Sequence, residues 1–206
     1  LVNNPVWGTG KVGSGSLNFD GVDDYVSAGS LGSTFFSSNS TLSVWLKSDI
    51  SAGSWRGAIT QGANDAGFWW LGFWSGAWQF YGNAGSQSLR SPNISSGTWY
   101  HIAIVQNGSN LLMYVNGAQV ASDSRSTTGN NGLLYIGRTG TYSEFLDGSI
   151  DDLRVYNRAL SASEVTELYN YVEAPSDTEA PFVPANLSAT AISSSQINLA
   201  WTASTD

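Results

Sequence analysis

The sequence of 206 residues contains no cysteine, one histidine and one methionine, and it has only eight lysines and arginines against sixteen acidic residues. The absence of cysteine excludes disulfides and thiol chemistry. The net charge of −8 argues against nucleic acid as a partner, because a phosphate-binding surface needs clustered Lys and Arg. Apolar runs stay shorter than the roughly 18 residues that span a membrane, so we predict no membrane insertion.

The chain also lacks the residue patterns of several enzyme classes. His101, the only histidine, lies in an apolar segment between Tyr100 and Ile102, where a structural role is commoner than a catalytic one. The sequence has no nucleophile-elbow motif to supply a catalytic serine. Glycoside hydrolysis needs two suitably spaced carboxylates, and most of the glutamates fall in a predicted helix or around a predicted linker. We therefore predict that the protein is not an enzyme.

Glycine and aromatic residues are abundant, with 23 Gly, nine Trp, nine Tyr and eight Phe. Short apolar segments with alternating polarity recur between turns rich in Gly, Ser and Asn. Examples are 99–106, followed by Asn107-Gly108, and 111–115, followed by Asn116-Gly117. About a dozen such segments predict an all-β fold in which two antiparallel sheets pack as a jelly-roll sandwich.

A single short helix is expected near residue 165. Ser161 and Glu164 have the spacing of a capping box, in which each side chain bonds the backbone N–H of the other residue. Val165, Leu168 and Tyr169 follow at helical spacing, which predicts an amphipathic helix.

Asp151, in the strand before this helix, shares a predicted strand face with Val155. Burying a carboxylate among apolar neighbours is unfavourable unless the carboxylate is paired or bound to a cation. This position therefore suggests a metal site. The alternative is that Asp151 and Asp152 pair with Arg154 or Arg158.

The segment 69–81 concentrates aromatic residues. Strand alternation places Trp69 and Phe73 on one face, and Trp70 and Trp74 on the other. Aromatic rings stack on the apolar faces of sugars, and neighbouring polar side chains bind the hydroxyl groups. The predicted ligand-binding patch consists of Trp55, Arg56, Trp70, Trp74, Gln79, Tyr81 and Asn83. The alternative is that both faces of the sheet are covered and these rings are ordinary core.

Four blocks in chain order resemble bacterial laminin-G-like jelly rolls of the concanavalin A-like superfamily. The blocks are Leu-Asn-Phe-Asp-Gly-Val-Asp-Asp-Tyr-Val with the preceding Gly-Lys-Val-Gly (10–26), Thr-Leu-Ser-Val-Trp-Leu-Lys (41–47), Gly-Thr-Trp-Tyr-His-Ile-Ala (97–103) with Tyr-Val-Asn-Gly (114–117), and the strand-to-helix segment (148–161). The resemblance implies a structural Ca²⁺ between the first and last blocks, with Asp151 as the first candidate ligand and Asp20 as the second. Without the resemblance, Asp20, Asp23 and Asp24 also fit a turn held by Asx hydrogen bonds.

We expect residues 1–172 to form the laminin-G-like domain and the Pro-rich, acidic segment 173–184 to be a linker. Residues 185–206 resemble the first two strands of a fibronectin type III domain, with Trp201 as its core tryptophan. Such a domain needs about 100 residues, so this segment is expected to be an incomplete one.

The predicted function is that of a calcium-stabilised, lectin-like module in a secreted or surface-anchored multidomain protein, holding a polysaccharide or glycan. The competing hypothesis is a structural or adhesive unit that contacts other surface proteins, because fold does not settle function. The aromatic patch discriminates between them. Exposure of Trp70, Trp74 and Tyr81 in a groove favours sugar, whereas burial favours the structural role.

Overall fold

The computed structural model describes residues 1–50, 53, 55–62, 68–82, 86–124, 129, 131–140, 142–172 and 185–202. The chain divides into two compact units, Leu1–Val172 and Glu173–Asp206. None of the described helices is long and apolar enough to cross a membrane.

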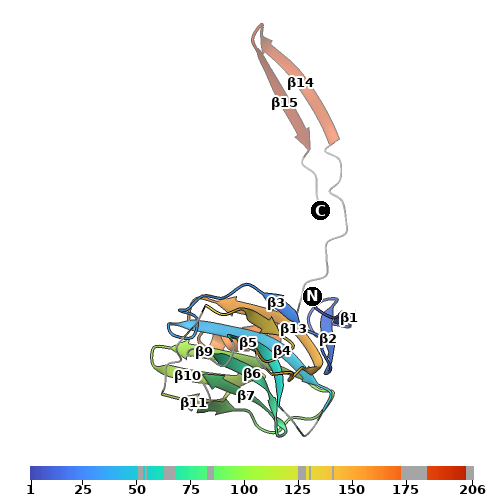
Figure 1. Cartoon of the computed structure of the whole chain (residues 1–206). Coiled ribbons are helices and arrows are strands. Elements are labelled where there is room, and N and C mark those ends of the chain that lie inside the picture. Colours follow the sequence, from blue (N-terminus) through green and yellow to red (C-terminus); the bar gives the residue numbers. More distant parts are fainter. Residues whose placement is uncertain are drawn as a thin grey trace. The chain divides into compact units, whose positions relative to one another are not determined.

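The first unit is built from two antiparallel sheets (Figure 1). One sheet has seven strands in the order β1 (Val6–Gly8), β2 (Ser16–Asp20), β13 (Asp147–Tyr156), β4 (Ser40–Ser48), β9 (Trp99–Asn107), β10 (Asn110–Val115) and β11 (Ala118–Asp123). The other has six strands in the order β3 (Val26–Ala28), β12 (Leu134–Ile136), β5 (Arg56–Gln61), β6 (Trp69–Trp74), β7 (Ala77–Gly82) and β8 (Ser86–Arg90). The predicted all-β, two-sheet sandwich is confirmed.

The core lies between the sheets, and every second side chain of each central strand points into it. In β6, Trp69, Leu71 and Phe73 are fully buried and belong to this core, and in β7 Trp78 and Phe80 do the same. Burial of each such side chain contributes roughly 1.5–3 kcal/mol, so this layer dominates the stability of the sandwich. The intervening residues of β6 and β7 point away from the core, toward what we call the outer face of the six-stranded sheet.

The helix α1 (Ala162–Asn170) forms as predicted, with both hydrogen bonds of the capping box present between Ser161 and Glu164. It covers the outer face of the seven-stranded sheet, where Val165 is fully buried against Ala103 and Val105 of β9. The helix therefore closes the sandwich on the side opposite the six-stranded sheet.

His101 lies in the same layer and is 1% exposed. Its Nε2 is 2.9 Å from the Ser43 hydroxyl, and its ring contacts Trp45 and Tyr169. Burial, with the nearby Arg154 guanidinium as a second cause, lowers the pKa of His101 to about 4. This environment supports the interpretation of His101 as a structural residue.

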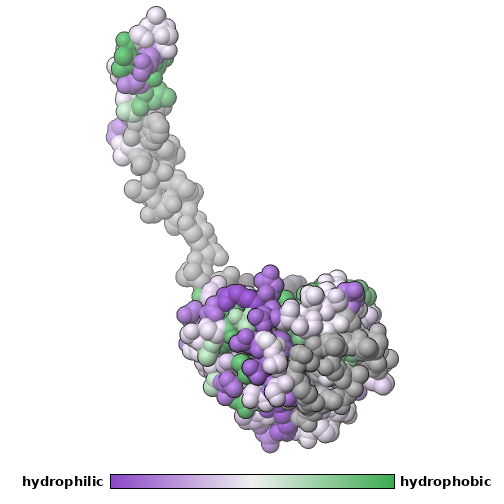
Figure 2. All heavy atoms as spheres, turned by 90° about the vertical axis from the view of Figure 1, so that its left-hand side faces the viewer, coloured by the Kyte–Doolittle hydropathy of each residue, from purple (hydrophilic) through white to green (hydrophobic). Residues whose placement is uncertain are grey.

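The second unit contains an antiparallel hairpin of β14 (Ala185–Ser193) and β15 (Gln196–Thr202). Ile192, Ile197 and Leu199 are more than half exposed, and hydrophobic residues are visible on the hairpin surface in Figure 2. A two-stranded hairpin is marginally stable by itself in water, so these side chains offer surface for further packing. The relation of this hairpin to a fibronectin type III domain stays a prediction.

Candidate functional site

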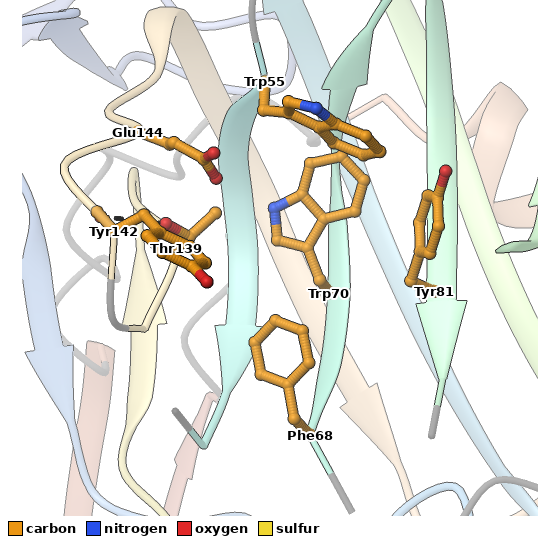
Figure 3. A pocket seen from close by; sticks show the side chains of 7 residues that line it. All are labelled: Trp55, Phe68, Trp70, Tyr81, Thr139, Tyr142 and Glu144. Atoms are coloured by element: carbon orange, nitrogen blue, oxygen red, sulfur yellow. Dashed lines mark hydrogen bonds between the residues drawn. The ribbon is translucent and has the colours of Figure 1, made fainter. Parts of the chain in front are cut away.

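A cavity of about 390 Å³ opens on the outer face of the six-stranded sheet, a size within the usual range for small-ligand sites. We call it the aromatic pocket (Figure 3). Its lining side chains are Trp55, Phe68, Trp70, Tyr81, Thr139, Tyr142 and Glu144.

The floor of the aromatic pocket is a group of rings on β6, β7 and the start of β5. Trp70 contacts both Trp55 and Tyr81 edge-on, at centroid distances of 5.2 and 5.3 Å. The Trp55 ring also stacks on Trp74 at 4.5 Å with an interplanar angle of 4°. A glycine at position 72 is required, because a Cβ there would lie 2.4 Å from the Trp70 ring. The sheet thus provides a pre-formed aromatic surface.

The opposite wall comes from residues 137–140 and 142–146, which belong to the connection between β12 and β13. The Glu144 carbonyl accepts hydrogen bonds from the N–H groups of Gly57 (3.0 Å) and Thr139 (3.2 Å). A Cβ on Gly57 would lie 2.2 Å from the Arg138 carbonyl carbon, so only glycine allows this approach. The two hydrogen bonds fix the backbone of Glu144 beside the aromatic floor.

Two polar groups in the aromatic pocket stand out. Trp70 is 3% exposed, yet its Nε1 has no hydrogen-bond partner among the described residues. Burial raises the pKa of the half-buried Glu144 carboxyl, and the Thr139 hydroxyl and the Arg56 charge partly offset this effect. In Figure 3 the indole nitrogen of Trp70 faces the side on which Glu144 and Thr139 lie. One donor and one acceptor are therefore directed at the same space.

Of the predicted patch, Trp55, Trp70, Trp74 and Tyr81 come together as expected. Trp55 and Tyr81 line the pocket, whereas Trp74 supports Trp55 from outside it. Trp70 is largely buried, so the floor is less exposed than the sequence predicts, because the rings of Trp55 and Tyr81 pack against it.

Two other predicted ligand residues do not reach the pocket surface, and a third is not described. Gln79 is fully buried; its amide donates to the Trp74 carbonyl (3.0 Å) and accepts from the Tyr81 hydroxyl (3.2 Å). It therefore positions Tyr81 and is not itself available for a ligand. Asn83 lies outside the described residues.

Arg56 was also predicted to belong to the ligand-binding patch, and it does not line the aromatic pocket. A bulge between Gly57 and Ile59 shifts the register, so Arg56 lies opposite the core-facing Phe73. Its Nη1 donates to the carbonyls of Gly21 and Phe145, both at 3.3 Å. The guanidinium thus braces two loops at the edge of the sandwich and does not line the aromatic pocket.

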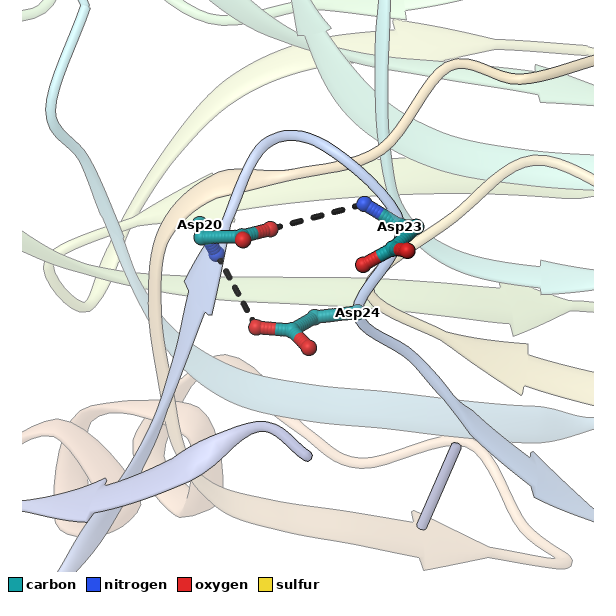
Figure 4. A group of neighbouring side chains, drawn as sticks. All are labelled: Asp20, Asp23 and Asp24. Carbon is teal, nitrogen blue, oxygen red and sulfur yellow. Dashed lines mark hydrogen bonds between the residues drawn. The ribbon is translucent and has the colours of Figure 1, made fainter. Parts of the chain in front are cut away.

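A second cluster is the acidic turn, which we define as Asp20, Asp23 and Asp24 (Figure 4). One oxygen from each carboxylate lies within 4.8 Å of the other two. Asp24 is 6% exposed, and its pKa is raised by burial and then by the charge of Asp20. Asp147 is paired with Asp20 in the sheet, and its pKa is raised by burial and by Asp49. Such mutual repulsion is relieved by a bound cation.

Asp151 does not join this cluster, which corrects the predicted pairing of Asp20 with Asp151. Asp20 lies opposite Asp147, four residues before Asp151, a separation of about 13 Å along a strand. Asp151 instead accepts hydrogen bonds from the N–H groups of Lys11 (2.6 Å) and Val12 (2.8 Å). These backbone amides compensate the partial burial of its charge.

Sequence reasoning missed the pocket residues Phe68, Thr139, Tyr142 and Glu144. The last three belong to one connection, which meets β5 through long-range contacts such as that between Glu144 and Gly57. The available signal in the sequence was weak: an aromatic side chain (Tyr142) two residues before an acidic one (Glu144), close to Gly140.

Comparisons with known proteins agree on the fold. A family model described as the concanavalin A-like lectin/glucanases superfamily, of laminin G type, matches residues 20–166. Domain 4 of AbnA, an extracellular arabinanase of Geobacillus stearothermophilus solved with arabinotriose, is 20% identical with a TM-score of 0.67, over 81% of this chain and 82% of that chain. A comparison with curated proteins found no match.

Two toxin domains have similar structures. The binding domain of Paraclostridial Mosquitocidal Protein 1 is 19% identical (TM-score 0.66, 82% of this chain and 46% of that chain). The receptor binding domain of botulinum neurotoxin type G is also 19% identical (TM-score 0.63, 82% and 44%). The chain thus spans less than half of either toxin domain, and these likenesses show the shared fold.

Proposed function

This chain belongs to the laminin G-type family of the concanavalin A-like lectin/glucanases superfamily, and we propose that it is a non-catalytic carbohydrate-binding module. The observation that carries the proposal is the aromatic pocket, in which indole and phenol rings form the floor and Glu144 stands opposite. Rings of this kind bind the apolar face of a sugar, and the carboxylate accepts hydrogen bonds from its hydroxyl groups. The arabinotriose complex of AbnA domain 4, which has the same fold, supports this choice of ligand class.

The setting that we propose is a secreted or surface-anchored multidomain protein, in which the module holds a polysaccharide or glycan in place. Binding of this kind requires no bond-breaking chemistry. The buried His101, which is 1% exposed and bonded to Ser43, has no access to a ligand in the aromatic pocket and takes no part.

The test is a glycan array followed by isothermal titration, using the whole chain and the variant Trp55→Ala. Trp55 is half-buried and lines the pocket, so its removal should weaken binding at least about tenfold while leaving the core intact. Trp7→Ala is the matched control, because Trp7 is 71% exposed on β1 of the other sheet. The proposal fails if no glycan binds, or if Trp55→Ala and Trp7→Ala behave alike.

We also propose that the acidic turn holds a structural Ca²⁺. Hard cations take six to eight oxygen ligands, and here Asp20, Asp23 and Asp24 converge, with Asp147 on the neighbouring strand. These residues fit such an ion, because a cation would neutralise carboxylates whose pKa is raised by burial and mutual repulsion. Its role would be to stabilise the turn between β2 and β3.

Thermal unfolding with Ca²⁺ and with EDTA tests the ion. The wild type should melt higher in Ca²⁺, and Asp24→Asn should lose that difference. Glu167→Gln, an exposed change on α1, should keep it. Equal melting temperatures of the wild type in both solutions would refute the calcium proposal without affecting the sugar site.

The structural or adhesive role remains the second candidate, because the hairpin exposes Ile192, Ile197 and Leu199. A partner protein that packs on these side chains would bury them. Loss of binding to surface proteins on changing Ile197 and Leu199 to Ser, with glycan binding unaffected, would favour this role.

A further inference from the structure

We propose that the aromatic pocket selects uncharged sugars and rejects sugars that carry a carboxylate, such as uronic and sialic acids. This inference rests on the proposed carbohydrate-binding function and names the ligand class of the same site. It comes from the two polar groups that face the pocket, the Trp70 indole N–H and the Glu144 carboxylate.

The hydrogen-bonding groups of the aromatic pocket match the hydroxyl groups of a neutral sugar. The indole N–H can only donate, and an ionised carboxylate can only accept. A sugar hydroxyl accepts from the indole and donates to the carboxylate, so neutral hydroxyl groups satisfy both Trp70 and Glu144. A carboxylate on the ligand can satisfy Trp70 but offers nothing to Glu144, and an ammonium has the opposite defect. Where the ligand carboxylate takes the place of a hydroxyl group facing Glu144, the half-buried Glu144 is left without a donor, and this weakens binding.

The charge of the aromatic pocket disfavours an anionic ligand. Among the described residues that line the pocket, Glu144 is the only ionisable group that is charged at neutral pH, and it is negative. The neighbouring cations are directed at backbone carbonyls: Arg56 at those of Gly21 and Phe145, and Arg138 at those of Thr139 and Gly140. Recognition of a carboxylate in proteins relies on a cation that forms charge-assisted hydrogen bonds with it. An anionic sugar would here meet repulsion from Glu144 without such compensation.

The backbone of Glu144 is held in place beside the aromatic pocket. Its carbonyl is held by the N–H groups of Gly57 and Thr139. Arg138 and Phe145, which precede and follow Glu144 in the sequence, form an isolated antiparallel β-bridge. This bridge ties the two ends of the connection together. The backbone therefore keeps Glu144 at the pocket wall, and the field of its carboxylate is stronger there than in open water because partial burial lowers the local dielectric.

The experiment compares matched ligands by isothermal titration at pH 8, where the carboxylate is ionised. The probes are β-1,4-galactotriose against β-1,4-linked trigalacturonate analogues, and β-1,4-mannotriose against β-1,4-trimannuronate. A neutral glycan identified on the array is paired with its C6-oxidised form in the same way. In each pair whose neutral sugar binds, we expect the neutral sugar to bind at least about tenfold more tightly than the acidic one.

The variant Glu144→Gln keeps the shape of the side chain and removes its charge. In this variant, the affinities for the neutral and the acidic ligand of a pair should differ by no more than about threefold. The change should come chiefly from tighter binding of the acidic ligand. Glu167→Gln removes the same charge from α1 and should leave the ratio of these affinities unchanged. Circular dichroism melting confirms that both variants fold.

The outcomes are distinguishable. Equal or tighter binding of the acidic member by the wild type overturns the selectivity and leaves the sugar-binding function standing. A ratio that Glu144→Gln does not change also overturns the inference, because the rejection would then come from elsewhere. Absence of binding by all members of both series, and by the whole array, refutes the proposed function itself.

Discussion

Acidification should destabilise the sandwich through its single histidine. Burial, helped by the charge of Arg154, lowers the pKa of His101 to about 4 in the folded chain. The value in the unfolded chain is about 6.5. The unfolded state therefore binds more protons between these values, so the stability present above pH 6.5 is lost progressively as the pH falls toward 4. The difference of about 2.5 pKa units corresponds to a loss of about 3 kcal/mol in total, of which about 2 kcal/mol is lost by pH 5.

Urea unfolding followed by tryptophan fluorescence at pH 8, 7, 6 and 5 measures this loss. Asp24, Asp147 and Glu144, whose carboxyl groups have a raised pKa in the folded chain, act in the opposite direction, because they favour the folded state as they protonate. The comparison of the wild type with a variant that lacks the imidazole therefore isolates the contribution of His101. His101→Gln should flatten the dependence between pH 7 and 5, and an NMR titration of the folded wild type should place the ring pKa near 4. A wild-type slope equal to that of His101→Gln, or a ring that titrates near 6.5, would refute the reasoning.

Three further substitutions follow from the contacts above. Gly72→Ala should abolish glycan binding, because the added Cβ would lie 2.2 Å from the Arg56 carbonyl oxygen and 2.4 Å from the Trp70 ring, which displaces both; Gly29→Ala, with no atom within 4 Å of the added Cβ, should leave glycan titrations unchanged. Thr41→Val removes a hydroxyl that donates to a backbone carbonyl at 2.9 Å and accepts an N–H at 3.0 Å, so denaturant unfolding should show a loss of about 2 kcal/mol; a loss under 0.5 kcal/mol would contradict this. Ser161→Ala removes the N-cap of α1 and should cost about 1 kcal/mol in the same assay, with an unchanged m-value.

Local patterns predicted the parts of the structure that local physics determines. Alternation assigned Trp69 and Phe73 to the core and Trp70 to the outer face, because a strand must present successive side chains to opposite faces. The capping box predicted the start of α1, because its two hydrogen bonds join residues three apart. These assignments need no knowledge of what lies far along the chain.

The sequence misplaced Asp151 and Arg56 because the strand alternation is interrupted near them. A bulge between Asp151 and Arg154 shifts the register of β13 against β4, and another at Gly57 turns Arg56 inward. Asp151 also finds its partners 140 residues away, at Lys11, which sequence spacing does not reveal. The wall of the aromatic pocket was missed for the same reason.

In the aromatic pocket, the rings that form the floor and the segment that faces them belong to different parts of the fold. The ring floor belongs to β6 and β7, whose opposite side is the core, so changing it endangers the whole sandwich. The facing connection is closed at its base by the bridge between Arg138 and Phe145, and the side chain of Tyr142 within it is 57% exposed. Its exposed positions can be exchanged without disturbing the sheet. The ligand specificity of this module can thus be changed, by evolution or by design, through replacement of the connection while the aromatic floor is kept.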